Sequence, residues 1–178
     1  MTDQDCADAA RARLAMAYEA CELARLARTA VPVGEHELRP DGAGRSPGSV
    51  LADAAHVLRA AHRFFGAAAV CERLGGASWQ VVGDTLGVDA RTARTRFAAA
   101  ESRFREELRS PDRATGALDG SGWWRAYTAG NPLEAARDLD DWVLRHEEAD
   151  GDTDGGGDPL PVSGGLARYL NSISPEVS

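Results

Sequence analysis

The chain has 178 residues, of which 43% are apolar, and its 28 acidic and 20 basic residues give a net charge of −8. This length suits one domain with a buried core, and no stretch is apolar enough to span a membrane. The first 13 residues lack the apolar core of a signal peptide, so we expect a cytoplasmic protein.

The residue types indicate an all-α protein without a metal or cofactor. Alanine, which favours helix, is abundant, while valine and isoleucine are sparse and show no sustained alternation. Cys6, Cys21 and Cys71 are far apart and form no CxxC or Cys/His pattern, which disfavours a disulfide framework or a zinc site. We expect them to be small buried apolar groups. No nucleophile–base pair or phosphate loop is visible, so the sequence does not indicate an enzyme.

Long helices are predicted in the first half of the chain. The first spans residues 4–30, within an N-terminal segment (residues 1–30) suited to packing or dimerisation. Its face carries Leu14, Ala17, Tyr18, Cys21 and Ala24. A loop rich in proline and glycine follows over residues 31–48. The next helix, residues 49–74, has an apolar stripe wide enough to contact more than one neighbouring element.

Two shorter helices follow, bounded by residues that start or end helices. A glycine pair, Gly75 and Gly76, ends the long helix, and Ser78 caps a short one over residues 79–86. Gly87 ends that helix, and Asp89 caps the next, which runs over residues 90–109. Together with the long helix before them, they make up a predicted domain of residues 49–110.

The C-terminal third is predicted to contain one helix and an acidic linker. In residues 111–147, an Asn131-Pro132-Leu133-Glu134 sequence resembles a capping box and predicts a helix over residues 132–147. Glycines and acids crowd the start of residues 148–178, where we expect a flexible linker and then a short tail helix.

The two short helices meet the demands of a helix-turn-helix unit. Val82 and Leu86 provide apolar contacts, and Gly83 allows the two helices to cross closely. Gly87 tolerates the left-handed backbone of the turn, and Val88 fills the gap between the helices. On the second helix, an inward stripe is predicted at Ala93, Phe97, Ala100 and Phe104.

The outer face of the second helix is the predicted DNA-binding surface. With 100° per residue, Arg91, Arg94 and Thr95 point away from the stripe and are assigned to bases in the major groove. Arg96, Arg103 and Arg105 are assigned to phosphates. Small side chains at Ala90 and Ala98 let the backbone approach the groove.

The charges along the chain agree with this assignment. Residues 90–109 hold six arginines and three glutamates, a net charge of +3, whereas residues 131–158 hold ten acids and two arginines, a net charge of −8. The acidic total therefore reflects one acidic segment beside a basic helix.

The same stretch resembles a known family of regulators. Its residues Gly76, Ser78, Trp79, Val82, Gly83, Leu86, Gly87, Val88, Ala93, Arg96 and Phe97 match the pattern of the helix-turn-helix in small actinobacterial regulators, which is similar to region 4 of sigma factors. The resemblance implies a tri-helical DNA-binding domain whose first helix is the end of residues 49–74. Asp89 stands where the family has serine or threonine, and the other sigma-factor regions are absent.

We therefore expect an all-α helical bundle that contains a tri-helical helix-turn-helix DNA-binding domain and a flexible acidic C-terminal linker. The predicted function is a transcriptional regulator that binds double-stranded DNA as a homodimer. Three alternatives stay open from the sequence. The two short helices can be a plain helical hairpin of the bundle. The chain can be an interaction module that binds a sigma factor, an RNA polymerase subunit or a toxin through its tail. It can also sense a small molecule, which requires a pocket near Trp123 and Trp124.

Overall fold

The computed structural model describes residues 3–34, 47–109, 124, 127–128 and 130–147. Its helices are α1 (Asp3–Thr29), α2 (Ser49–Leu74), α3 (Trp79–Leu86), α4 (Ala90–Arg109) and α7 (Pro132–Glu147). Each bound agrees with the predicted one to within one residue. No strand occurs in these ranges, which confirms the all-α prediction for them. The predicted linker and tail helix, residues 148–178, lie outside the described residues.

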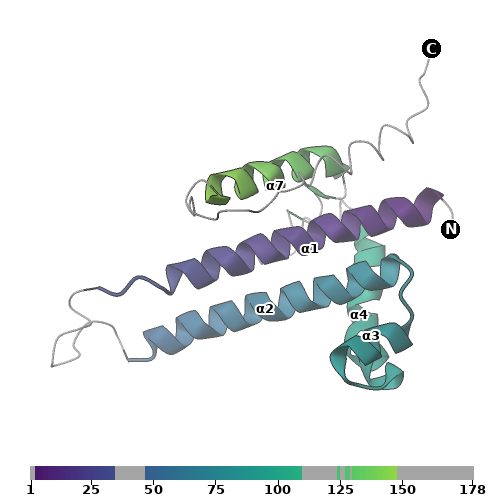
Figure 1. Cartoon of the computed structure of the whole chain (residues 1–178), viewed down its shortest axis with the longest axis horizontal. Helices are drawn as coiled ribbons and strands as arrows, with labels where there is room; N and C mark the ends of the chain where they lie inside the picture. Colours follow the sequence, from purple (N-terminus) through teal and green to yellow (C-terminus); the bar gives the residue numbers. More distant parts are fainter. Residues whose placement is uncertain (1–2, 35–46, 110–123, 125–126, 129, 148–178) are drawn as a thin grey trace, which may run out of the picture.

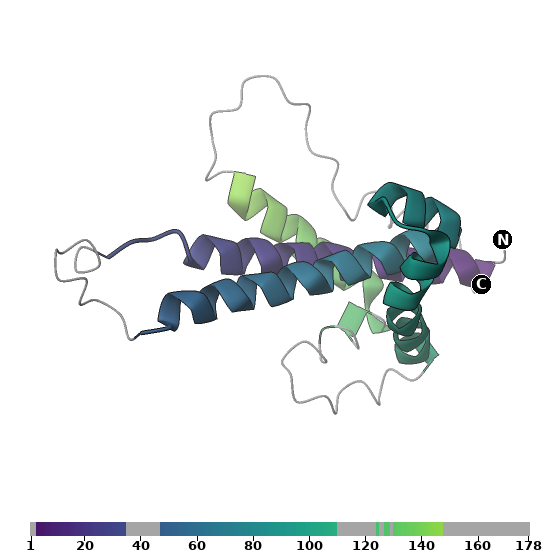
Figure 2. The same ribbon diagram turned by 90° about the horizontal axis from the view of Figure 1, so that it is seen from below.

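The two longest helices, α1 and α2, lie side by side as an antiparallel hairpin (Figure 1). Helix α7 packs along α1 on the side away from α2. Helices α3 and α4 lie at the end of the hairpin where α1 begins and α2 ends, and α4 crosses the hairpin steeply in both views (Figure 2). The end of α1 and the start of α2 are therefore far from α4. None of the described helices has the length and hydropathy needed to cross a membrane.

The residues at the helix ends explain where each helix begins and ends. Gly48 precedes α2 with a left-handed φ of 89°, and Gly76 follows the helix with a φ of 101°. The hydroxyl oxygen of Ser78 accepts a hydrogen bond from the Val81 N–H at 3.2 Å, which caps α3 as predicted. These local signals are enough to place the ends, because each acts within a few residues.

Small side chains let the hairpin and its neighbours pack closely. Ala12 of α1 is buried against Val70 and Leu74 of α2, and Ala100 and Phe104 of α4 pack against this cluster. On the other face of α1, a second cluster joins Leu14 to Ala136 and Leu139 of α7, with Ala17 and Cys21 against it. Alanines at the contact points bring the helix axes close together.

A partly buried ion pair also connects the two long helices. The Nε of Arg63 on α2 donates a hydrogen bond to Oε2 of Glu19 on α1 at 2.9 Å, and Glu19 is only 5% exposed. The two residues are 44 positions apart, so only the folded hairpin brings them together.

Two of the three cysteines pack against the core as apolar groups, although both are partly buried rather than buried as predicted. Burial, reinforced by the charge of Glu22, raises the pKa of Cys21 to about 11, and burial also raises the pKa of Cys71. Both thiols are therefore protonated at neutral pH and poorly reactive. The side chain of Cys6 is outside those that the structure describes.

Helix α2 buries only part of its predicted stripe. Its C-terminal half contacts α1, α3 and α4, which confirms that the stripe meets more than one element. In the N-terminal half, however, Val50, Leu51 and Leu58 are more than half exposed. The sequence pattern shows which side chains lie on one face but not whether a neighbour covers that face.

Candidate nucleic-acid interface

Helices α3 and α4 meet at a turn that favours glycine. Gly87 has a left-handed φ of 66°, and the Val88 N–H donates a hydrogen bond to the Gly83 carbonyl oxygen at 3.0 Å. A Cβ atom at Gly83 would lie 2.6 Å from the Val88 carbonyl oxygen and 3.1 Å from the Asp89 carbonyl carbon. The predicted close crossing at Gly83 is therefore present.

The buried face of α4 fixes the rotation of the helix about its axis. Ala93 is fully buried and Phe97 is 4% exposed, in one cluster with Ala69 of α2 and Val82 of α3. The Phe97 ring meets the Phe65 ring of α2 edge to face, with centroids 5.6 Å apart. Because these contacts come from two other helices, α4 cannot rotate without breaking the core.

The three side chains assigned to bases lie on the opposite face of α4. Arg91, Arg94 and Thr95 are all exposed. Among the described residues, no carboxylate lies within ion-pair distance of Arg91 or Arg94, so both guanidinium groups are open to a ligand. The Thr95 hydroxyl donates to the Arg91 carbonyl oxygen at 2.9 Å. Its proton is thus used within the helix, and it can only accept a hydrogen bond from another molecule.

The two alanines of the predicted surface, Ala90 and Ala98, are both partly exposed. With 100° per residue, Ala98 lies on the arginine face and Ala90 at its border with the buried stripe. Neither side chain extends beyond its Cβ atom, so the backbone of α4 is accessible beside Arg91 and Arg94.

The three arginines assigned to phosphates have different surroundings. Arg96 is exposed, and its guanidinium lies 5.2 Å from the Phe65 ring centroid and 5.4 Å from that of Phe97. Arg103 is exposed, and its Nε donates to the Ala99 carbonyl oxygen at 3.4 Å. Arg105 is instead held by Glu101, with Nη2 and Oε1 3.1 Å apart. Of the three, Arg105 is the least available to a phosphate.

Glu101 connects α4 to Arg73 at the end of α2, a contact that sequence reasoning missed. Besides Arg105, it accepts a hydrogen bond from Nε of Arg73 at 3.3 Å. The Arg73 guanidinium also bonds to the Ala77 carbonyl oxygen and lies 4.4 Å from the Trp79 ring centroid. This network joins residues 28 positions apart. In the sequence this network appears only as an acid and an arginine on two different helices. Such pairs are common, so the sequence alone does not predict the contact.

Asp89 caps the N-terminus of α4 as predicted. Its Oδ1 accepts a hydrogen bond from the Thr92 N–H at 2.7 Å, and its Oδ2 accepts one from the Thr92 hydroxyl at 3.1 Å. These hydrogen bonds, which favour the charged carboxylate, lower the pKa of Asp89 below its ordinary value of 3.8. The cap also places a negative charge two residues before Arg91 and five before Arg94.

The lowered pKa of Asp89 predicts how acid affects this helix. A carboxylate with a lower pKa in the folded state stabilises the fold above its unfolded pKa of 3.8, and this contribution disappears as the pH falls through the folded pKa. Asparagine caps a helix without titrating, so Asp89→Asn should lose less stability than the wild type between pH 5 and about pH 3. Thermal unfolding of both proteins across this range measures the difference. If the unfolding temperatures of both proteins fell equally as the pH is lowered, this role for Asp89 would be contradicted.

The described residues offer no metal site, and the comparisons with known proteins found no match. No cluster of three or more His, Cys, Asp or Glu side chains in the described ranges is arranged to hold a metal ion. The chain matches no protein-family model, no curated protein and no solved structure.

Proposed function

We propose that the protein is a sequence-specific DNA-binding transcriptional regulator that acts as a homodimer. In this proposal the end of α2, together with α3 and α4, is a tri-helical helix-turn-helix domain. Helix α4 lies in the major groove, where Arg91 and Arg94 donate hydrogen bonds to guanine and Thr95 contacts a neighbouring base. Arg96 and Arg103 bind the phosphates that flank the groove.

The observation that carries this proposal is the accessibility of one face of a rigidly held helix. Ala93 and Phe97 fix the rotation of α4, and this rotation leaves Arg91, Arg94 and Thr95 exposed on the other side. A guanidinium without a carboxylate partner can donate two parallel hydrogen bonds to the O6 and N7 atoms of guanine. A plain hairpin within a bundle does not require basic residues at these positions.

The exposed apolar residues at the far end of the hairpin support the dimer. Val31 and Val33 follow α1, and Val50, Leu51 and Leu58 lie in the first half of α2; each is more than half exposed. When a second copy of the chain covers these side chains, apolar surface is removed from water. Two hairpins packed in parallel about a two-fold axis have both α4 helices at the same end. Two half-sites about 34 Å apart on DNA require this arrangement.

Salt dependence and stoichiometry test this function with the whole chain. After genomic fragments bound by the purified protein have been selected, affinity for the best fragment should fall steeply with salt because bound arginines release counterions. Two phosphate contacts in each of two subunits predict a slope of log K against log salt of about −4. Sedimentation of the complex should give two chains per duplex.

An interaction module that binds a protein through its tail predicts a different result. Its DNA affinity should be weak and equal for all fragments, so selection would enrich no sequence. That result, or one chain per duplex at saturation, would contradict the proposed homodimeric regulator.

A further inference from the structure

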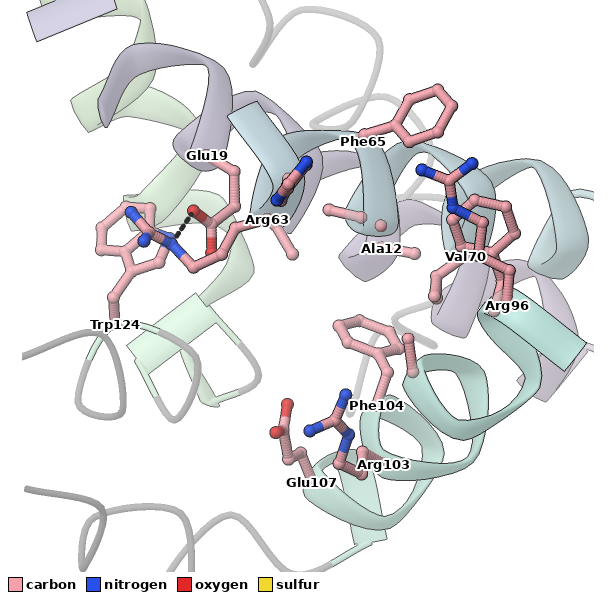
Figure 3. Close-up of a pocket in the computed structure, with 16 residues that line it drawn as sticks. Ala12, Glu19, Arg63, Phe65, Val70, Arg96, Arg103, Phe104, Glu107 and Trp124 are labelled. Carbon is pink, nitrogen blue, oxygen red and sulfur yellow. Dashed lines mark hydrogen bonds and ion pairs between the residues drawn. The ribbon is translucent and has the colours of Figure 1, made fainter. Parts of the chain in front are cut away.

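A cavity of about 570 Å³ lies between the α1–α2 hairpin, α4 and Trp124. Figure 3 shows Glu19, Arg63 and Trp124 on one side of it, with Arg103, Phe104 and Glu107 on the opposite side. Pockets for small molecules commonly have volumes of roughly 300–1,000 Å³, so this one is large enough for a ligand with two rings or a medium-length alkyl chain.

The described side chains around the cavity carry a net charge of +1. Three arginines line it, at positions 63, 96 and 103, against two glutamates, at positions 19 and 107. Arg63 is paired with the buried Glu19, and the remaining charged residues of the described lining are Arg96, Arg103 and Glu107. In Figure 3 the Arg103 guanidinium points into the cavity from α4. This balance favours a ligand with a single negative charge.

Apart from His62, the rest of the described lining is apolar and well anchored. Phe65, Val70, Phe104 and Trp124 contribute large apolar surfaces. Trp124 is 5% exposed and stacks on Tyr18 of α1 with ring centroids 4.0 Å apart, so it is part of the packed structure. A ligand with an aromatic or alkyl body can therefore bury that body here without rearranging the walls.

We propose that this cavity binds a small organic monoanion whose carboxylate, sulfonate or similar group pairs with Arg103 and whose apolar body packs between α2, α4 and Trp124. Arg96 lies at the α2–α4 edge of the same cavity. The ligand therefore contacts the buried side of the helix whose outer side carries Arg91 and Arg94.

Such a ligand also opposes DNA binding, and this part of the inference rests on the proposed function. Arg96 and Arg103 are the two residues assigned to phosphates, and an anion bound to them removes them from that role. Binding of ligand and binding of DNA are then mutually antagonistic, each reducing the affinity for the other by the same factor.

Two fluorescent probes that differ in one group test the site on the whole chain. The probes are 8-anilinonaphthalene-1-sulfonate and its neutral analogue N-phenyl-1-naphthylamine, which has the same rings without the sulfonate. The wild type should bind one molecule of the sulfonate per chain. In Arg103→Gln its affinity should fall on the order of tenfold while that of the neutral probe stays constant. Arg59→Gln, at an exposed arginine that does not line the cavity, is the matched control and should change neither.

Filling the cavity gives a second and independent test. Gly66 lines it from the middle of α2, and a Cβ atom there meets nothing within 4 Å. Gly66→Leu should therefore fold normally, with an unfolding temperature no lower than that of the wild type, and should bind neither probe. Unchanged binding of the sulfonate in Gly66→Leu or in Arg103→Gln overturns the proposal, as does failure of the wild type to bind both probes.

The antagonism between ligand binding and DNA binding is tested separately. The sulfonate probe should weaken DNA binding of the wild type and leave that of Gly66→Leu unchanged. If the probes bind as expected but the wild type binds no DNA, the ligand site stands and the proposed function fails. If the wild type binds DNA and the probe does not change that affinity, the antagonism is wrong.

Discussion

Replacing Gly83 with alanine should destabilise the protein by about 2–3 kcal/mol, because the new methyl group meets backbone that cannot move away. Its Cβ atom would lie 2.6 Å from the Val88 carbonyl oxygen and 3.2 Å from the Ala90 nitrogen. Val88 and Ala90 are fixed in turn by the cap of α4 and by the cluster around Phe97. The strain can be relieved only if α3 and α4 separate. That separation also displaces the arginine face relative to α3. DNA affinity should therefore fall together with the free energy of unfolding.

The same substitution at another glycine is the control. Gly66 also lies within a helix, but a Cβ atom there has open space around it. Gly66→Ala should therefore stabilise the protein by roughly 0.5–1 kcal/mol, since alanine favours helix more than glycine does. Denaturation with urea, with each variant compared to the wild type, measures both free energies of unfolding. Equal effects at the two positions would show that the close crossing at Gly83 is not maintained in solution.

Replacing Arg91 or Arg94 with alanine should cost about 1–3 kcal/mol of DNA-binding free energy at each position, which corresponds to a loss of roughly 5- to 150-fold in affinity. Both side chains are exposed, and no carboxylate in the described ranges pairs with them. Their removal should therefore leave the free energy of unfolding nearly unchanged. Each variant should also accept more bases at one position of each half-site, because a contact that distinguishes bases has been lost.

Arg59→Ala is the matched control for these two variants. It removes the same charge from an exposed position on α2, away from α4. Its affinity should fall only slightly and equally for all DNA sequences, because a distant charge contributes through the general field alone. Gel-shift titrations of the three variants with the selected fragment and with a scrambled one make the comparison. If all three variants behave alike, Arg91 and Arg94 do not read bases.

The arginines assigned to phosphates on α4 show what the helical spacing of the sequence did not predict. The sequence assigned Arg96, Arg103 and Arg105 alike to phosphates, with Arg96 and Arg103 on one flank of the helix and Arg105 further along its outward face. In the fold, Arg105 is paired with Glu101, while Arg96 lies over two phenylalanine rings. Glu101 stands four residues before Arg105 on α4 itself, so the helical spacing contains that pair, whereas Phe65 lies on α2 and the spacing along α4 does not contain it.

The sequence by itself determined the helices, their ends and the inward stripe of α4. Ser78, Gly87 and Asp89 act on backbone atoms within about one helical turn, so their effects can be derived from neighbouring residues alone. The tertiary structure decided which charges are neutralised, which half of α2 is covered, and that a cavity lies beside Trp124. Each of these depends on how helices far apart in the chain meet. Small changes in helix packing decide whether two side chains touch. The periodicity within one helix contains no information about these contacts.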